Sequence, residues 1–337
     1  MEASNPEISI VVPMYNSSYF VKNCIESVLK QDFTNYELLL IDDHSTDETM
    51  EICKNYIQDK RIKLLCNEGK GVSSARNRGI MKSTGSYITF VDSDDVLEQT
   101  FLSKLLNIAK GNPRYLPMCG HVRFENGNPD FEVVDSSESN TVETNDLIAN
   151  IFYYHPASWG CLFQSEVIKK YGIKMEESAS FNEDIYFTVK YLCVCDGGII
   201  IPDKLYGYRT NINGIGANKP HNTLTAKDVE HRAKGYYAFQ DAIKFSEKNA
   251  PGKSVYIDIG YSFMAAEVLL TSVRAGIGEF DLKKKIKKYL SISHCIDFVR
   301  HGKNMYQKLL VCGVAINSHV IKYILDDMGL LKIIYSR

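Results

Sequence analysis

Four short clusters of polar residues could carry chemistry, and the most crowded is Asp92-Ser93-Asp94-Asp95. Three carboxylates within four residues repel one another unless a cation or several hydrogen-bond donors compensate. Carboxylate oxygens are the ligands that Mg²⁺ and Mn²⁺ prefer, and the D-x-D spacing puts alternate side chains on one side of an extended segment. The cluster therefore predicts a divalent-metal site in which one carboxylate meets the metal and another meets a ligand hydroxyl. A helix–loop–helix calcium site competes with this interpretation, but its spaced acids and closing glutamate are missing.

The other three clusters are Pro13–Asn16, Asp42–Asp43 and Glu183–Asp184. Aspartates that follow strands often cap the next helix or open a turn, so each pair taken singly has a purely structural explanation. The recurrence of such clusters at the ends of successive predicted strands is harder to explain by capping alone. We therefore expect several of them to belong to one ligand-binding site.

The elements that must position these clusters alternate between strand and helix. Apolar, β-rich runs predict strands at residues 8–12, 37–41, 62–65 and 87–91. Between them the sequence predicts a helix capped by Ser17 or Ser18, a second capped by Ser45 or Thr46, and a third over 73–82. Such alternation predicts an α/β fold with a mostly parallel sheet covered by helices on both faces. Ligands bind such sheets at the carboxyl ends of the strands, where the clusters fall.

Regular alternation ends after Asp95, and long helical periodicity dominates near the C-terminus. Residues 125–140 are polar and predict an exposed loop, while the Asn- and Gly-rich segment 210–222 predicts a joint. We therefore divide the chain into a catalytic domain, residues 1–220, and a smaller helical region, residues 221–337. The predicted helices of that region cover residues 225–248, 254–276, 281–290 and 305–325.

Composition limits the classes of partner. The chain has 337 residues, 45% of them hydrophobic and 24% charged, which is the balance of a globular protein. A net charge of −2 gives no field that would attract nucleic acid. The nine cysteines include no CxxC pair, so we interpret them as reduced thiols. The N-terminus lacks the features of a secretory signal, and no run reaches the ~18 apolar residues of a membrane span, so we expect a cytoplasmic protein.

Several motifs, in this order, resemble those of the family 2 glycosyltransferases of the GT-A fold. They are VVPMYN at 11–16, IDDHSTD at 41–47, GVSSARNRG at 71–79, DSDD at 92–95 and NED at 182–184. The resemblance spans roughly residues 8–210, and the ordered set is more specific than any one motif. It implies transfer of a hexose or N-acetylhexosamine from a nucleotide donor to a hydroxyl of a glycan, in the synthesis of cell-surface polysaccharide.

The resemblance also implies roles for individual residues in binding the donor. The implied donor site comprises Pro13 and Tyr15 at the base, Asp43 as acceptor for the base imide N–H, Arg76 near base and phosphates, Asp92 at the ribose, and Asp94 on Mn²⁺ or Mg²⁺. Ser93 also belongs to the implied nucleotide-binding residues. An acceptor-only carboxylate at Asp43 suits uracil, whose imide nitrogen donates, and disfavours cytosine, so the donor is expected to be a UDP-sugar. We expect Asp42, Asp47 and Arg78 to be structural.

The Glu183–Asp184 pair begins a predicted helix, where the helix dipole also favours acids. The resemblance implies that the aspartate of this pair corresponds to the general base of the family. Asp184 would then take the proton of the acceptor hydroxyl, and Glu183 would orient the acceptor. Since the leaving group is a nucleoside diphosphate, no second catalytic acid is needed, and a single displacement inverts the anomeric centre.

Three further residues have two interpretations each. Trp159 is either an aromatic platform for the acceptor sugar or a core residue. Arg209 resembles the family's arginine that grips the diphosphate, although the serine that usually follows is replaced by a Gly- and Asn-rich run. His221 could complete the metal site or be incidental.

Two other function classes compete with the transferase. A nucleotidyltransferase would carry a Gly-rich, basic loop after the first strand, where this chain has PMYNSS. A non-catalytic sugar-nucleotide- or glycan-binding module would have no use for a base such as Asp184. The helical C-terminal region is expected to dock a glycan or lipid-linked acceptor, to contact the inner membrane face, or to form a homo-oligomer. Its support is the basic run Lys283–Lys288 and the apolar character of 305–325.

Overall fold

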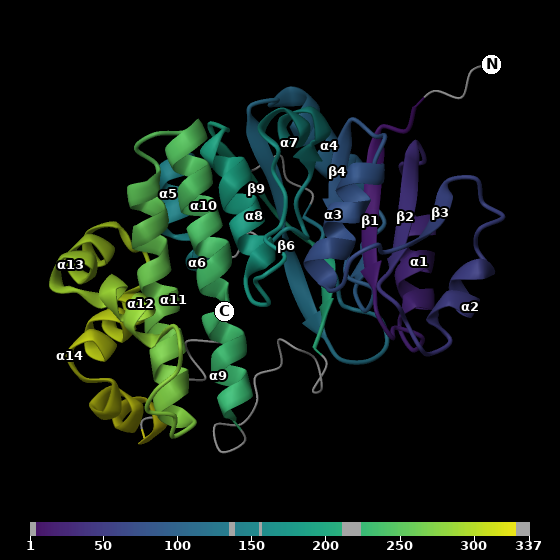
Figure 1. The fold of residues 1–337 in the computed structure, drawn as a ribbon. Helices are drawn as coiled ribbons and strands as arrows, with labels where there is room; N and C mark the ends of the chain where they lie inside the picture. Colours follow the sequence, from purple (N-terminus) through teal and green to yellow (C-terminus); the bar gives the residue numbers. More distant parts are fainter. Residues whose placement is uncertain (1–4, 135–138, 155–156, 211–223, 328–337) are drawn as a thin grey trace. The chain divides into compact units, whose positions relative to one another are not determined.

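The computed structural model describes residues 5–134, 139–154, 157–210 and 224–327, with side chains in the last helix described as far as Ile316. The chain forms two compact units whose segments interleave in the sequence (Figure 1). The first comprises Met1–Glu143, Pro156–Glu177 and Val194–Ala217, and the second Thr144–His155, Ser178–Cys193 and Asn218–Arg337. The predicted division at residue 220 thus differs from the compact units, because two segments that precede it cluster with the later helices. The predicted joint at 210–222 falls almost wholly outside the described residues.

The first unit is built on a five-stranded sheet of order β3-β2-β1-β4-β8. Its strands are β1 (Ile8–Met14), β2 (Tyr36–Asp42), β3 (Ile62–Cys66), β4 (Tyr87–Phe90) and the short β8 (Phe163–Gln164). Neighbours among β1 to β4 pair in parallel, and β8 pairs antiparallel with β4. The prediction of a mostly parallel sheet is confirmed. The central strands β1 and β2 are buried throughout, which is why most of their residues are apolar.

Helices cover both faces of this sheet, as predicted. Alternate residues of β1 point to opposite faces. Ile10 and its even-numbered neighbours share a core with α1 (Val21–Leu29) and α4 (Phe101–Gly111), whereas Val11 meets α3 (Val72–Lys82). A Cβ on Gly79 of α3 would lie 2.2 Å from Val11 Cγ1, so only glycine permits this close approach.

A second sheet completes the first unit, with order β5-β9-β6 and β7 paired to β9. Its strands are β5 (Val96–Leu97), β6 (Tyr115–Phe124), β7 (Asn140–Glu143) and β9 (Gly197–Arg209). The long β9 brings Tyr206 and Arg209 beside β5, which directly follows the acidic cluster. Two more helices, α2 (Thr49–Lys54) and α7 (Ser165–Tyr171), belong to this unit.

The predicted serine and threonine caps of the first two helices are wrong. Phe20 precedes α1 and Glu48 precedes α2, and neither makes a side-chain cap hydrogen bond. At α2 the Asp47 carboxylate instead accepts the Thr49 N–H at 3.0 Å. The Ser17 hydroxyl lies 2.6 Å from that of Ser93, so a long-range contact takes the group that was expected to cap.

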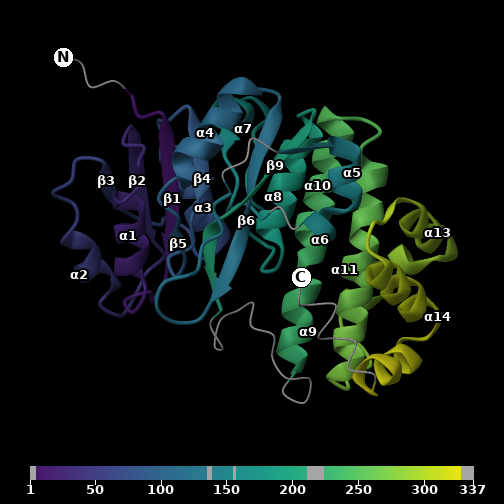
Figure 2. The same ribbon diagram turned by 180° about the vertical axis from the view of Figure 1, so that it is seen from behind.

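The second unit is helical (Figures 1 and 2). Its helix α11 (Ser254–Arg274) is buried over most of its length. Around it lie α9 (Ala226–Ala233), α10 (Gly235–Asn249), α12 (Lys283–Lys287) with the 3₁₀ turn η2 (Lys288–Leu290), α13 (Ile292–His301) and α14 (Met305–Asp327). The unit also takes in α5 (Thr144–Ala149), α6 (Ile151–Tyr154) and α8 (Glu183–Cys193). The single helix predicted over 225–248 is divided at Lys234, and α13 was not predicted. None of the described helices is long and apolar enough to cross a bilayer.

Candidate active site

The acidic cluster forms a turn at the carboxyl end of β4, closed by a hydrogen bond from Asp95 N–H to Asp92 C=O at 3.0 Å. Asp92 is paired with the buried Arg76, whose Nη2 donates to Asp92 Oδ1 at 2.6 Å. The Asp92 N–H donates to the hydroxyl of Tyr206 at 3.1 Å. Arg76 was expected near the base and phosphates of the donor. The structure places its guanidinium on the first carboxylate of the cluster.

Asp95 is the structural member of the cluster. It is almost fully buried and accepts the Tyr206 hydroxyl at 2.6 Å and the Arg209 N–H at 2.7 Å. Burial, and then the charges of Asp94 and Asp92, raise the pKa of Asp95 well above its ordinary value. The Tyr206 hydroxyl joins Asp95 to the Asp92 backbone, and thereby fixes both ends of the turn.

Asp94 differs from Asp92 and Asp95, because no side chain in the described part of the chain donates a hydrogen bond to its carboxylate. Burial, followed by the Asp92 charge, raises the pKa of Asp94 to about 6. A partly buried carboxylate that lies next to another acid and accepts no hydrogen bond from a side chain is electrostatically suited to a divalent cation. Among the described residues, no three His, Cys, Asp or Glu side chains are grouped to hold a metal. A cation on Asp94 would therefore need further oxygen ligands, which a bound diphosphate could supply, as is common for Mg²⁺.

The guanidinium of Arg209 supports the same turn. Its Nε donates to the Asp94 carbonyl at 2.8 Å, and its Nη1 donates to the Glu125 carbonyl at 2.8 Å. The group also lies over the rings of Phe124 and Phe20, 4.2 and 5.0 Å from the ring centroids. Arg209 was expected to contact the diphosphate. In the structure its side chain is buried and donates hydrogen bonds to two backbone carbonyls of the protein.

Asp43 lies one residue beyond the end of β2 and is buried. One carboxylate oxygen accepts Asn67 Nδ2 and the other accepts the Gly71 N–H, both at 2.8 Å. Gly71 immediately precedes α3, so the carboxylate also orders the start of that helix. Each oxygen has a second lone pair, which leaves acceptor capacity for a ligand N–H.

The residues that follow β1 occupy the same edge of the sheet. Pro13 is buried within β1, whereas Tyr15 is 61% exposed. Asn16, at φ 48°, turns the chain back. Ser17 and Ser93 then join the ends of β1 and β4 through their hydroxyls. Because β1, β2 and β4 are adjacent and parallel, Tyr15, Asp43 and Asp94 belong to one edge, as the sequence predicted.

Trp159 is half-buried in an aromatic cluster. Its ring stacks on Tyr206 and Tyr208, with centroids 4.7 and 5.5 Å apart, and meets His121 edge-on. A backbone bridge to Phe90 places it beside the strand that leads into the acidic turn. Packing against Tyr206 is therefore one function of this ring.

The residues expected to be structural have structural partners. Asp42 accepts the Ser45 N–H at 3.2 Å, and Asp47 holds the start of α2. Arg78 pairs with the exposed Glu68 at 2.6 Å. His221 lies outside the described residues.

The second acidic pair begins α8 in the helical unit. Glu183 is buried, and Asp184 is partly exposed and accepts the Ile185 N–H at 2.8 Å. Asn182, at φ 58°, makes the sharp entry into the helix. Burial lowers the pKa of His231, and the carboxylate of Glu183 opposes that shift. Both acids lie in the first turn, where the helix dipole stabilises their charge.

Comparison with known proteins identifies the fold and the family. The protein family described as "Glycosyl transferase family 2" matches residues 9–171 of this chain. Residues 9–171 form a family 2 glycosyltransferase domain. The uncharacterized glycosyltransferase EpsJ of Bacillus subtilis is 27% identical over 90% of this chain and 89% of its own length. The poly(ribitol-phosphate) β-N-acetylglucosaminyltransferase TarP of Staphylococcus aureus is 33% identical over 55% of this chain and 57% of its own.

Solved structures show that the chain has the GT-A fold, as expected. S. aureus TarS in complex with UDP superposes with a TM-score of 0.61 at 20% identity, over 88% of this chain and 80% of that chain. A mannosyltransferase of Pyrobaculum calidifontis, in complex with GDP-Man and Mn²⁺, gives a TM-score of 0.52 at 13% identity, over 94% and 88%. At these identities the similarity shows the fold alone.

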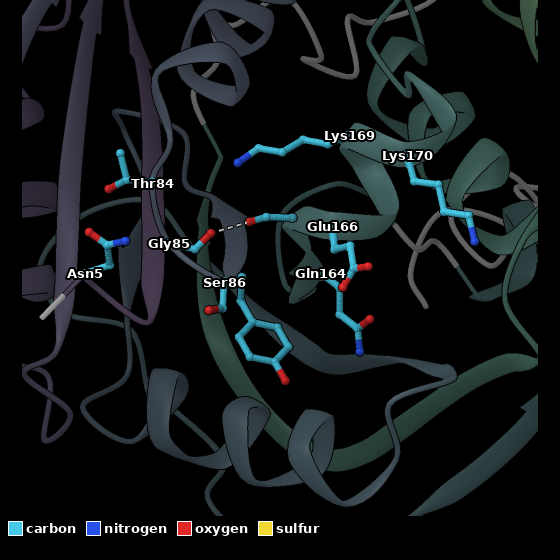
Figure 3. A pocket seen from close by; sticks show the side chains of 10 residues that line it. Asn5, Thr84, Gly85, Ser86, Gln164, Glu166, Lys169 and Lys170 are labelled. Atoms are coloured by element: carbon cyan, nitrogen blue, oxygen red, sulfur yellow. Dashed lines mark hydrogen bonds between the residues drawn. The ribbon is translucent and has the colours of Figure 1, made fainter.

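A pocket of about 770 Å³ opens at the other end of β4 of the glycosyltransferase domain (Figure 3). Thr84 and Gln164 are among the residues that line it, and Ser165 donates a hydrogen bond to the Gly85 carbonyl at 2.6 Å. Lys169 extends over the pocket toward Thr84, and Lys170 points away. The pocket lies at the amino end of β4 and the acidic turn at its carboxyl end, so we assign it no part in donor binding.

Sequence reasoning missed Tyr206, Ser17 and Asn67 as supports of the site. Tyr206 reaches Asp95 across 111 residues and Ser17 reaches Ser93 across 76, so no local pattern predicts either contact.

Proposed function

We propose that the protein transfers a hexose or N-acetylhexosamine from a UDP-sugar to a hydroxyl of a glycan acceptor, with inversion at the anomeric carbon. The observation that carries the proposal is the single sheet edge to which Tyr15, Asp43 and the 92–95 turn belong. That edge offers an exposed aromatic ring, a carboxylate that orders its loop, and a carboxylate that accepts no hydrogen bond from a side chain of the described residues. A nucleotide base, a ribose and a diphosphate need groups of these kinds.

The donor proposal rests on Asp43 and on the relatives. A carboxylate that keeps acceptor capacity suits the imide N–H of uracil. Structures of S. aureus TarS contain UDP and UDP-GlcNAc, which supports a UDP-sugar here. We further propose that Pro13 and Tyr15 contact the base, that Asp92 and Ser93 meet the ribose, and that Arg76 keeps Asp92 in place for that contact.

We propose that Mn²⁺ or Mg²⁺ binds through Asp94. The Asp94 carboxylate has the surroundings that such an ion stabilises: partial burial, a neighbouring acid and no donor side chain of its own among the described residues. Mn²⁺ in the P. calidifontis enzyme supports this choice. When bound, the ion would stabilise the charge that grows on the departing diphosphate. Arg209 then acts by holding the Asp94 backbone in place.

We propose Asp184 as the general base. The oxygen of the acceptor hydroxyl forms a bond to the anomeric carbon of the donor as the bond from that carbon to the diphosphate breaks, and the hydroxyl proton passes to the Asp184 carboxylate. UDP departs with the bonding electron pair. Glu183 orients the acceptor, and the partly exposed ring of Trp159 offers a face to its sugar.

The test is release of UDP from UDP-sugars with and without candidate glycan acceptors, after a thermal-shift screen of UDP-, GDP- and dTDP-sugars with Mn²⁺. We expect UDP-sugars to raise the melting temperature and UDP release to require acceptor. Pyrophosphate formation from UTP and a sugar phosphate would show a nucleotidyltransferase instead. Donor binding without turnover in the presence of any acceptor would favour a binding module.

A further inference from the structure

Two helices of the second unit expose apolar side chains along one face. On α14, Met305, Leu309 and Ile316 are 64%, 62% and 85% exposed. Their spacing of four and seven residues places them on one stripe of the helix. The other face of the same helix is buried through Gln307, Leu310, Val311 and Val314. The helix is therefore apolar on its outward side as well as on the side that packs.

A second stripe lies on α13. Ile292, Ile296 and Val299 follow the same helical spacing, and each is exposed, Ile292 to 80%. Phe298, which points to a different side of the helix, is buried. Both views show α13 and α14 on the same side of α11 (Figures 1 and 2). The exposed apolar residues of these two helices are called the apolar stripes below.

The sequence around the apolar stripes is strongly basic. Residues 282–308 contain eight lysines and arginines and a single acid, Asp297, although the whole chain has a net charge of −2. Within that segment Lys284, Lys285 and Lys287 are exposed on α12. An amphipathic element that combines exposed apolar residues with clustered lysines is typical of proteins that bind anionic lipid surfaces.

We propose that the apolar stripes, together with the α12 lysines, dock the protein on an anionic membrane surface. The apolar side chains enter the boundary between head groups and acyl chains, and the lysines meet lipid phosphates. Charge is the reason to prefer a membrane to a second copy of this chain. A two-fold interface places the same patch on both partners, so the lysines of the two copies would repel one another. The membrane carries the opposite charge.

Co-sedimentation with vesicles tests this proposal, using vesicles of phosphatidylglycerol mixed with phosphatidylcholine and vesicles of phosphatidylcholine alone. We expect the full chain to bind the anionic vesicles at least about tenfold more tightly, and added salt to weaken binding. The triple variant Met305→Gln, Leu309→Gln, Ile316→Gln and the triple variant Lys284→Gln, Lys285→Gln, Lys287→Gln should each lose at least about tenfold in affinity. All six side chains are exposed, so the variants should fold.

Matched controls come from exposed residues of the first unit. Ile57→Gln with Met81→Gln removes exposed apolar groups, and Lys60→Gln, Lys70→Gln and Lys82→Gln removes three exposed lysines. Both controls should bind anionic vesicles as the unaltered protein does. Equal binding to neutral vesicles, or full binding by the apolar triple variant, would overturn the proposal. So would a dimer in light scattering that only the apolar triple variant dissociates, because a second copy would then occupy the stripes. The outcome is independent of UDP-sugar turnover.

Discussion

The two acidic clusters of the protein, in the 92–95 turn and at the start of α8, each place neighbouring carboxylates in different surroundings. In the 92–95 turn, Asp92 is held by Arg76 and Asp95 by Tyr206, and only Asp94 is left without a donor side chain among the described residues. At the start of α8, Glu183 is buried, while Asp184 is partly exposed and contacts the helix N-terminus. Within each cluster the acids therefore differ in burial and in the groups that contact them. Surroundings, more than residue type, therefore indicate which acid can meet a ligand.

Asp184→Asn is expected to have the largest effect on rate. Asparagine keeps the size of the side chain and an oxygen that can accept the Ile185 N–H, and loses the capacity to take a proton. We expect transfer to fall by roughly a hundred- to ten-thousandfold, while UDP affinity is unchanged. Initial rates and calorimetric titration with UDP measure the two quantities separately. Near-normal transfer would mean that another group takes the proton, and loss of UDP binding would place Asp184 in the donor site.

Asp43→Ala tests whether a carboxylate that orders a loop also binds the base. The loss of an acceptor for a ligand N–H should weaken UDP binding by about ten- to a hundredfold. Stability should fall as well, because Asn67 and Gly71 lose their acceptor. Asn67→Ala removes one of the same loop contacts and keeps the carboxylate, so it is the control. Equal loss of UDP affinity in both variants would show that Asp43 has a purely structural role.

Tyr206→Phe tests the support of the acidic turn. The ring would still stack on Trp159, but Asp95 would lose a buried donor. We expect the free energy of unfolding to drop by about 1–3 kcal/mol and transfer to fall with it. Tyr208→Phe is the matched control, because Tyr208 also stacks on Trp159 and its hydroxyl has no hydrogen-bond partner among the described residues. Urea unfolding of both variants makes the comparison, and equal effects would count against a special role for the Tyr206 hydroxyl.

The smallest effect is expected at an ion pair outside the site. Arg78 binds Glu68, whose side chain is 71% exposed, whereas the Arg76–Asp92 pair is largely sheltered. Glu68→Gln should change the free energy of unfolding by at most about 1 kcal/mol and leave transfer unchanged. A large loss of activity in this variant would show that the edge of the site extends farther along the loop before α3 than we propose.

Sequence reasoning predicted the parallel sheet because strand-like and helix-like segments alternate along residues 8–91. It also predicted which sheet edge carries the polar clusters. It failed at helix starts, where Ser17 contacts Ser93 instead of capping, and it did not predict that α8 clusters with later helices. These features depend on contacts between segments distant in sequence, and no local propensity encodes them.

The roles of individual site residues needed the structure for the same reason. Arg76 and Arg209 were both expected on the donor, and the structure uses each to hold part of the acidic turn. The sequence shows only that three acids are crowded there. Which acid remains without a donor depends on Arg76 and Tyr206, which reach the turn from α3 and β9.

The most direct test of the account is calorimetric titration of UDP into the wild-type protein and Asp94→Asn, each with and without Mn²⁺. If Asp94 is the carboxylate that meets the cation, Mn²⁺ should strengthen UDP binding to the wild-type protein by at least about tenfold and have little effect on the variant. Without metal, the two proteins should bind UDP with similar affinity. An equal enhancement by Mn²⁺ in both proteins would contradict the account, because the cation would then be bound without Asp94.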